Sequence, residues 1–207
     1  MIIVEVPEFY VLRHGETEWN VAGRMQGALD SALTARGRAQ ARAMADCLAN
    51  RLGDRLANRL AAQEGALSVI SSPQGRALAT AQIVATRLGL PVSTDPRLSE
   101  IAMGAWTGLT LTQIAARWPR EAALANLFDW YGAIPDGEPL SAVRARLHSF
   151  LADQSRPAIV VTHGLTGLLL RTALMRGEAP SPRTAEQGVV YHLSQGVQRR
   201  LTPPDCP

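Results

Sequence analysis

Short apolar runs alternate with longer segments of helical periodicity along this chain. The runs at 8–13 and 158–162 combine aromatic and β-branched side chains, which is typical of buried strands. Further short strands are predicted at 67–71, 91–94, 189–193 and 197–201, the last two as a hairpin around Gly196. Helices are predicted over 34–62, 73–88, 109–118, 120–131, 139–153 and 164–175. Because strands alternate with helices, we expect a largely parallel sheet that is covered on both faces.

The predicted helix over 34–62 contains a local repeat. Leu48-Ala49-Asn50-Arg51-Leu52 recurs as Leu56-Ala57-Asn58-Arg59-Leu60, so that leucines recur every four residues. Side chains at this spacing share one face of a helix. We expect the helix to begin at an N-cap, Thr34, and to pack its leucines on the sheet. The alternative is that its outer part contacts a second subunit, which would make the protein a homodimer.

The composition is that of a globular protein. The chain has 207 residues, of which 46% are hydrophobic and 19% charged, so it can bury a core of its own. We expect a single domain over residues 1–207, with a disordered tail at 203–207.

Several features favour the cytoplasm. No apolar run reaches the roughly 20 residues that span a bilayer, and residues 1–7 lack the basic end and cleavage site of a signal peptide. The only cysteines, Cys47 and Cys206, give neither a disulfide framework nor a zinc-binding spacing, which fits a reducing compartment. We expect a cytoplasmic protein that does not contact a membrane.

The chain is basic, with a formal net charge of +3 and a pI of about 9.4, and all of its cationic side chains are arginines. The arginines are scattered and interleaved with acids, and neither a basic run nor an aromatic stacking motif is present. This pattern argues against binding of nucleic acid and suits an anionic small molecule.

Candidate chemistry begins where the first predicted strand ends in Arg13, His14 and Gly15. Ligands of open α/β sheets bind at the carboxyl ends of the strands. A guanidinium there can donate two parallel hydrogen bonds to a phosphate, and the neighbouring imidazole could attack phosphorus. Taken alone, the segment is a weak signal, and its ordinary explanation is a strand end that carries a surface histidine.

Three further segments carry polar groups at similar places. Ile70-Ser71-Ser72-Pro73 leads into a helix whose first turn carries Arg76, and Val160-Val161-Thr162-His163-Gly164 repeats the His-Gly arrangement. The loop at 97–108 carries Glu100. Each feature alone has an ordinary explanation, namely a solvated arginine, a buried core histidine, and a solvated or capping glutamate.

In this order, the segments resemble the histidine phosphatase superfamily, also called phosphoglycerate mutase-like. The resemblance rests on Leu-Arg-His-Gly-Glu-Thr-Glu-Trp-Asn at 12–20, Ser-Ser-Pro followed by Arg76, Leu-Ser-Glu followed by Gly-x-Trp-x-Gly, and Thr-His-Gly, and it spans residues 8–193. It implies an α/β fold, a three-layer αβα sandwich with a mostly parallel sheet, and a short helical lid inserted at about 101–140.

The resemblance also implies roles for five side chains. His14 would be the nucleophile that takes the phosphoryl group, and Glu100 the general acid that protonates the leaving oxygen. Arg13, Arg76 and His163 would surround the transferred oxygens and stabilise their charge. His14 must be neutral to attack, and the neighbouring cations favour that form, whereas His163 would become cationic when a dianionic phosphate binds.

Further positions are candidates for contact with phosphate or substrate: Asn20, Gln26, Gly27 and Gly164. Trp106 is expected to pack against the Glu100 loop, the alternative being a platform for substrate. Glu138 matches the family pattern, but Pro139 stands where a serine is usual, so the partner of Glu138 is open. No cluster has metal-ligand spacing and the arginines supply positive charge, so we expect no metal and no cofactor.

The segment at 101–140 distinguishes the functions open to this family. It is short and aromatic, with Arg117 and Arg120 as its only basic residues, whereas the family's mutases carry a longer insertion with paired arginines and a lysine. We therefore expect a metal-independent phosphatase that hydrolyses a small phosphorylated metabolite through a phosphohistidine. Mutase-type phosphotransfer and a catalytically weak regulatory or binding role are the alternatives.

Overall fold

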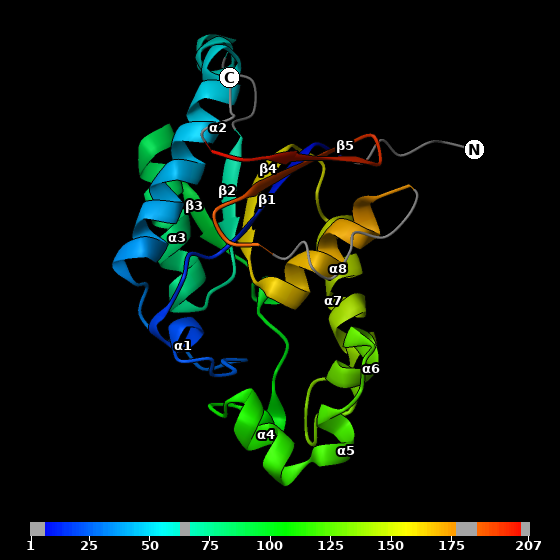
Figure 1. Cartoon of the computed structure of the whole chain (residues 1–207). Coiled ribbons are helices and arrows are strands. Elements are labelled where there is room, and N and C mark those ends of the chain that lie inside the picture. Colours follow the sequence, from blue (N-terminus) through cyan, green and yellow to red (C-terminus); the bar gives the residue numbers. More distant parts are fainter. Residues whose placement is uncertain (1–6, 63–66, 177–185, 204–207) are drawn as a thin grey trace, which may run out of the picture.

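The computed structural model describes residues 7–62, 67–176 and 186–203, with the side chains of 54–62 left out (Figure 1). Its centre is a six-stranded sheet in the order β3-β2-β4-β1-β5-β6. The strands are β1 (Phe9–Arg13), β2 (Ser68–Ser71), β3 (Val92–Thr94), β4 (Ala158–Thr162), β5 (Val190–Ser194) and β6 (Val197–Leu201). Every strand predicted from the apolar runs is therefore present.

Strand direction brings the candidate residues to one edge of the sheet. β4 runs parallel to β1 and β2, and β2 runs parallel to β3, whereas β5 and β6 form an antiparallel hairpin beside β1. Arg13 of β1 pairs with Thr162 of β4, and Ser71 of β2 pairs with Val161. The carboxyl ends of these three strands therefore meet, and so do the polar residues that follow them.

Helices cover both faces of the sheet (Figure 1). One face carries α2 (Ala35–Ala62) and α3 (Gly75–Leu88), and the other carries α7 (Leu140–Ala152) and α8 (Gly164–Leu174). Alternation along β1 divides the core, because Tyr10 and Leu12 pack on the α2 and α3 side, and Phe9 and Val11 on the opposite side. The fold is the expected three-layer αβα sandwich. In the described part of the chain, no helix has the length and hydropathy needed to cross a membrane.

The long helix α2 begins as predicted, since the hydroxyl of Thr34 accepts the N–H of Gly37 at 2.9 Å. Leu48 and Leu52 are buried in the core, which confirms the leucine stripe for the first copy of the repeat. The side chains of the second copy lie outside the described residues.

Cys47, next to Leu48 in α2, is disulfide-bonded, so the expectation that the cysteines form no disulfide is wrong at this residue. The other cysteine, Cys206, lies outside the described residues. The expectation rested on the spacing of the cysteines in the sequence, which does not report which side chains meet in the fold.

The lid lies between β3 and α7 and contains α4 (Leu111–Arg117), α5 (Pro119–Ala122) and α6 (Leu127–Gly132). The single helix predicted over 120–131 is wrong, because Asn126 begins a new helix by accepting the N–H groups of Phe128 and Asp129. Asparagine favours a helix N-cap over a helix interior. The short helix α1 (Glu18–Val21) and the 3-10 turns η1 (Pro96–Leu98) and η2 (Gly104–Trp106) were not predicted.

Trp106 joins the lid to the core of the sandwich. Its side chain is fully buried, and its ring lies 4.7 Å from that of Trp130 and 6.2 Å from that of Trp118, centroid to centroid. The packing role that was expected for Trp106 is therefore confirmed, and the lid helices are fixed beside the strand ends.

Candidate active site

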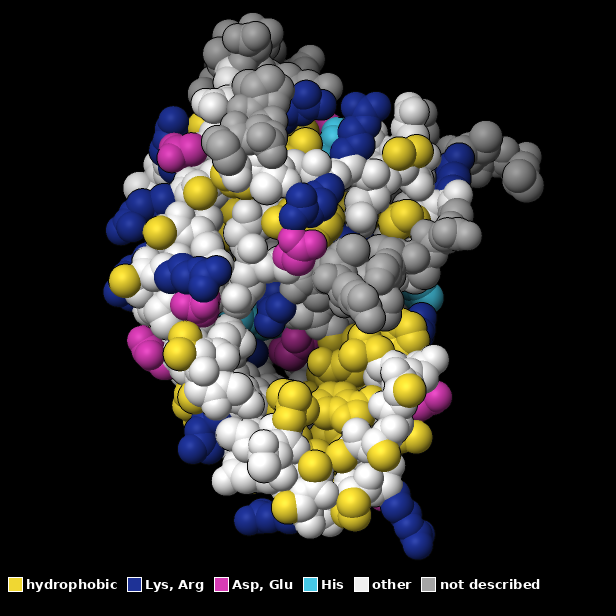
Figure 2. All heavy atoms as spheres, in the orientation of Figure 1, with side chains coloured by type: hydrophobic (Ala, Val, Ile, Leu, Met, Phe, Trp, Pro, Cys, Tyr) yellow, Lys and Arg dark blue, Asp and Glu magenta, His cyan; other side chains and the backbone are white. Residues whose placement is uncertain are grey.

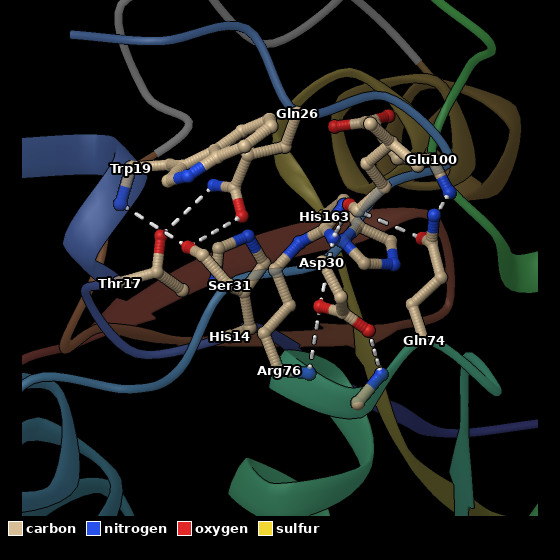
Figure 3. A network of polar contacts seen from close by, with 12 residues as sticks. His14, Thr17, Trp19, Gln26, Asp30, Ser31, Gln74, Arg76, Glu100 and His163 are labelled. Carbon is tan, nitrogen blue, oxygen red and sulfur yellow. Dashed lines mark hydrogen bonds and ion pairs between the residues drawn. The ribbon is translucent and has the colours of Figure 1, made fainter. Parts of the chain in front are cut away.

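Side chains from four separate segments converge at the carboxyl edge of the sheet (Figure 3). His14 follows β1, Arg76 lies in the first turn of α3, Glu100 lies in the loop after η1, and His163 follows β4. The rings of His14 and His163 are 5.2 Å apart, centroid to centroid, and are inclined by 60°. We call Arg13, His14, Arg76 and His163 the phosphate cage.

A main-chain oxygen fixes the tautomer of His14. The Nδ1 atom of the ring lies 2.7 Å from the carbonyl oxygen of Gly15. Because a carbonyl oxygen only accepts, Nδ1 carries the proton and donates it, which leaves a lone pair on Nε2. The backbone N–H of His14 donates to the carbonyl oxygen of Thr162 at 2.9 Å, so β4 holds the residue in place. The imidazole is therefore oriented as a nucleophile that attacks through Nε2.

The position after His14 requires glycine. A Cβ atom at Gly15 would overlap the carbonyl oxygen of Gly37 in α2, so any residue with a side chain would require the backbone to move. The N–H of Gly15 donates to Oγ1 of Thr80 in α3 at 3.1 Å. Two helices thus fix the carbonyl group that orients the nucleophile.

The electrostatics of the cage favour neutral imidazoles. Burial, followed by the charges of Arg13 and Arg76, holds the pKa of His14 well below its usual range. Burial, followed by His14 and the same arginines, lowers the pKa of His163 in the same direction. The expectation that His14 is neutral is thus supported. A dianionic phosphate in the cage would oppose the lowering at His163.

The two ring nitrogens of His163 differ in their hydrogen bonding. Its Nε2 atom lies 2.8 Å from the hydroxyl of Ser72, which follows β2. Its Nδ1 atom is buried and has no hydrogen-bond partner among the described residues. Buried polar atoms are seldom left unsatisfied, so Nδ1 is the atom that could donate to a bound phosphate.

Arg76 is held by several acceptors. Its NH1 group donates to the carbonyl oxygen of Leu29 at 2.6 Å and to Oδ1 of Asp30 at 3.0 Å, and its NH2 group donates to the carbonyl oxygen of Gly27 at 2.9 Å. Its Nε atom is buried and has no partner within the described chain. Arg76 can therefore give a phosphate its charge and one N–H group.

Asp30 is a supporting residue that sequence reasoning missed. Its carboxylate accepts the backbone N–H groups of Gly75 and Arg76, in addition to the Arg76 side chain (Figure 3). Gln74, the N-cap residue of α3, forms no capping hydrogen bond with its own side chain, so Asp30 caps the helix instead. The separation of 46 residues leaves no local signal for this contact.

Glu100 lies beside Arg13 at the beginning of α8. A Cβ atom built on Gly164 would lie 3.5 Å from Cζ of Arg13 and 3.7 Å from Oε2 of Glu100, so both groups flank this glycine. The Glu100 carboxylate accepts the N–H of Leu165 at 3.2 Å and that of Thr166 at 3.1 Å. Burial lowers the pKa of Arg13, and the charge of Glu100 opposes that change. The helix N-terminus thereby anchors the candidate acid next to the cage.

Gln74 joins three parts of the site and was also missed. Its Nε2 atom donates to the carbonyl oxygen of Gly27 at 2.8 Å, and its Oε1 atom accepts the N–H of Glu100 at 2.9 Å (Figure 3). The same Oε1 atom lies 3.4 Å from NH2 of Arg76. One amide therefore links the Gly27 loop, the Glu100 loop and Arg76.

Two predicted contact residues have supporting roles in the structure. Gln26 is buried, with Nε2 donating to Oγ1 of Thr17 at 2.9 Å and Oε1 accepting from the hydroxyl of Ser31 at 3.2 Å. Both ends of its amide therefore form hydrogen bonds within the loop, and the contact of Gln26 with phosphate stays a prediction. Asn20 caps α1 through Oδ1, which accepts the N–H of Thr17 at 3.1 Å, so that only its Nδ2 could reach a phosphate.

The structure shows which residue pairs with Glu138, which the sequence left open. Its carboxylate accepts hydrogen bonds from Nε of Arg146 at 2.8 Å and from NH2 of the same arginine at 3.1 Å. Its N–H donates to the carbonyl oxygen of Ala102 at 3.0 Å. Pro139 follows as the N-cap residue of α7. Glu138 thus ties the end of the lid to the Glu100 loop.

Across the described residues, no group of three His, Cys, Asp or Glu side chains could hold a metal ion.

Comparison with known proteins agrees with this geometry. The family model "Histidine phosphatase superfamily (branch 1)" matches residues 9–192, which include all of the cage. A Proteus mirabilis protein named "Probable phosphoglycerate mutase GpmB" is 38% identical over 176 residues, covering 81% of this chain and 74% of that protein. A mycobacterial glucosyl-3-phosphoglycerate phosphatase, solved with VO3, is 30% identical with a TM-score of 0.72, covering 94% of this chain and 97% of its own.

A phosphoglycerate mutase from Thermus thermophilus is also 30% identical, with a TM-score of 0.65, and the match covers 94% of this chain and 98% of that one. Proteins named as phosphatases and as mutases thus share this fold. The family match extends from β1 to β5 and contains every candidate residue described above. This chain belongs to the histidine phosphatase superfamily, branch 1.

Proposed function

We propose that this protein is a metal-independent phosphatase that hydrolyses a small phosphorylated metabolite through a phosphohistidine on His14. The observation that carries the proposal is the 2.7 Å contact between Nδ1 of His14 and the carbonyl oxygen of Gly15, which leaves Nε2 as the nucleophilic atom inside the cage. We also propose that it acts in the cytoplasm, although the disulfide at Cys47 removes the support that the cysteine pattern gave to a reducing compartment.

In the first step, Nε2 of His14 attacks phosphorus and the bond between phosphorus and the leaving oxygen breaks. The leaving oxygen takes a proton from Glu100, which enters the step as the acid. Arg13, Arg76 and His163 hold the transferred oxygens and balance their charge, which is the main demand of phosphoryl transfer.

In the second step, water attacks the phosphohistidine and the bond between phosphorus and Nε2 breaks. The Glu100 carboxylate accepts a proton from the attacking water, so that inorganic phosphate leaves and both His14 and Glu100 return to their starting forms. The Gly15 carbonyl oxygen holds the Nδ1 proton of His14 throughout.

The test is hydrolysis of p-nitrophenyl phosphate in the presence of a metal chelator, with His14→Ala as the comparison. We expect turnover by the wild type, none by the variant, and an acid-labile phosphoryl adduct on His14 after rapid quenching. Activity that survives in His14→Ala, or that disappears with the chelator, would refute the proposal.

A second candidate function is phosphoglycerate mutase activity, which the name of the Proteus mirabilis relative favours. A mutase must grip a second anionic group, and the described lid offers only Arg117 and Arg120, both of them exposed. Interconversion of 2- and 3-phosphoglycerate with a bisphosphate primer, without release of inorganic phosphate, would support the mutase.

A further inference from the structure

The position of the candidate acid indicates where a leaving group must lie. Arg13, His14, Arg76 and His163 surround the phosphoryl group in the proposed mechanism, and the leaving oxygen must point toward Glu100. The carbon skeleton of the substrate then continues beyond Glu100, away from the cage. The lid residue Tyr131 lies near this position, because it interacts electrostatically with both Glu100 and Arg13.

The lid surface beside this position is apolar. Figure 2 shows hydrophobic side chains gathered over the lid helices, directly next to the hollow in which acidic and basic side chains are visible. The lid contributes partly buried side chains that pack against the core, and we call this set the lid wall: Trp118, Leu127, Phe128, Trp130 and Tyr131. An apolar surface bordering a catalytic hollow marks a contact region for an apolar group.

Tyr131 connects the lid wall to the reacting groups. Its ring packs edge-on against Trp130, 5.1 Å between centroids, and Trp130 in turn packs on the buried Trp106. Burial and the charge of Glu100 raise the pKa of Tyr131, while the charge of Arg13 opposes that change. The phenol therefore lies close enough to both charged groups to interact with them, and its ring packs against the rings of Trp130 and, through Trp130, Trp106.

The charges of the lid do not suit an anionic leaving group. Arg117 and Arg120 are exposed, and they are the only cations in the segment 101–140. From α7, the Arg144 guanidinium lies over the Phe128 ring, 5.5 Å from its centroid. A carboxylate or a second phosphate placed against the lid wall would lose its hydration without gaining a buried partner.

We infer that the preferred substrates carry an aromatic or otherwise apolar leaving group that packs on the lid wall against Tyr131. This inference rests on the proposed phosphatase function and narrows its substrate class. Packing a phenyl ring on this surface removes the ring from water. The kcat/KM of an ester that carries the ring should therefore exceed that of a matched ester without it by on the order of tenfold to a hundredfold.

The test compares esters of alcohols with similar leaving tendency, so that intrinsic reactivity does not decide the result. We expect kcat/KM for 2-phenylethyl phosphate to exceed that for ethyl phosphate, glucose 6-phosphate and 3-phosphoglycerate by about tenfold or more. Turnover that is equal for all four, or that favours 3-phosphoglycerate, would overturn the inference.

A binding measurement separates this inference from the proposed function. The stable ligands 3-phenylpropylphosphonate and propylphosphonate are titrated calorimetrically into the full chain. Tighter binding of the phenyl compound without hydrolysis of any ester would sustain the lid assignment and sink the phosphatase proposal. Equal binding of the two phosphonates would sink the lid assignment whatever the enzyme hydrolyses.

Variants locate the contact. Tyr131→Phe keeps the apolar ring and should keep the preference for the phenyl phosphonate, whereas Tyr131→Asn should reduce it by about tenfold. Val197→Ser, at an exposed apolar position on β6, is the control and should change nothing. An unchanged preference in a folded Tyr131→Asn variant would contradict the role of Tyr131.

Discussion

The hydroxyl oxygen of Thr166 lies 2.9 Å from Oε1 of Glu100, and it also lies 2.8 Å from the carbonyl oxygen of Ser99. A hydroxyl has one proton to donate and can also accept. When Thr166 donates to Glu100, it stabilises the carboxylate. When it donates to Ser99, its oxygen can accept a hydrogen bond from the protonated Glu100 carboxyl group. Thr166 can therefore hold the candidate acid in both of the forms that the proposed two-step reaction requires.

We expect Thr166→Val to lower kcat/KM for alkyl phosphates by about tenfold to a hundredfold, since a hydrogen bond to a charged group is lost. Turnover of p-nitrophenyl phosphate should fall much less, because its leaving group departs without a proton. Steady-state kinetics with both esters, and with Thr166→Ser as the variant that keeps the hydroxyl, checks this. An equal loss for both esters would contradict the positioning role.

Gln74→Leu removes a side chain that Glu100 and Gly27 both use. The Glu100 N–H then loses its partner at a partly buried position, and the Gly27 carbonyl keeps only the hydrogen bond from Arg76, which should destabilise the fold by about 1–3 kcal/mol. Urea unfolding measures the loss, and Gln82→Leu on the exposed side of α3 is the matched control. If both variants lose the same stability, the bridging role of Gln74 is wrong.

Much of this architecture could be predicted from the sequence because each buried strand is a short apolar run that can be recognised locally. The apolar runs that end in Arg13, Ser71 and Thr162 define β1, β2 and β4. Once parallel pairing is inferred from the alternation of strands and helices, the residues after these strands must share an edge. This logic, together with the family motifs, brought His14, Arg76, Glu100 and His163 together as predicted.

The supporting contacts could not be read in the same way. Asp30, Gln74 and Thr166 act on residues 46, 26 and 66 positions away, and no periodic pattern encodes such pairs. Gln26 shows a role that the motif did not predict. Both ends of its amide form hydrogen bonds inside the loop, and its contact with phosphate stays a prediction.

The two histidines predict loss of stability in acid. In the unfolded chain each imidazole takes up a proton near its usual pKa of about 6.5, whereas burial and the neighbouring cations keep the pKa values of His14 and His163 well below that in the fold. As the pH falls below about 6.5, the unfolded state therefore binds more protons, and each histidine costs up to about 1.4 kcal/mol per pH unit.

Chemical denaturation between pH 7 and pH 5 measures this slope. Replacing His163 by glutamine removes one of the two titrating groups, so the loss of stability on acidification should become less steep by up to about 1.4 kcal/mol per pH unit. A variant whose stability falls with pH as steeply as that of the wild type would show that His163 is not held neutral in the folded protein.

Asp30 and Asp46 allow the stability effect of a buried ion pair to be compared with that of a surface ion pair. The Asp30 carboxylate caps α3 and pairs with Arg76, whose side chain is only 1% exposed. Asp30→Ala therefore leaves a helix end uncapped and a buried guanidinium with one acceptor fewer, which should cost about 1–3 kcal/mol. Asp46→Ala breaks an ion pair with Arg87 that is shorter, 2.7 Å against 3.0 Å, but in which both side chains are more than half exposed, and it should cost less than about 1 kcal/mol.

These two aspartate variants remove the same group, so a similar loss of stability in urea would mean that Asp30 does not secure the cage. We also expect Asp30→Ala to weaken inhibition by inorganic phosphate, because Arg76 loses a contact that fixes its guanidinium. Asp46→Ala should leave that inhibition unchanged, because its partner Arg87 lies on the exposed surface of α3 and outside the cage.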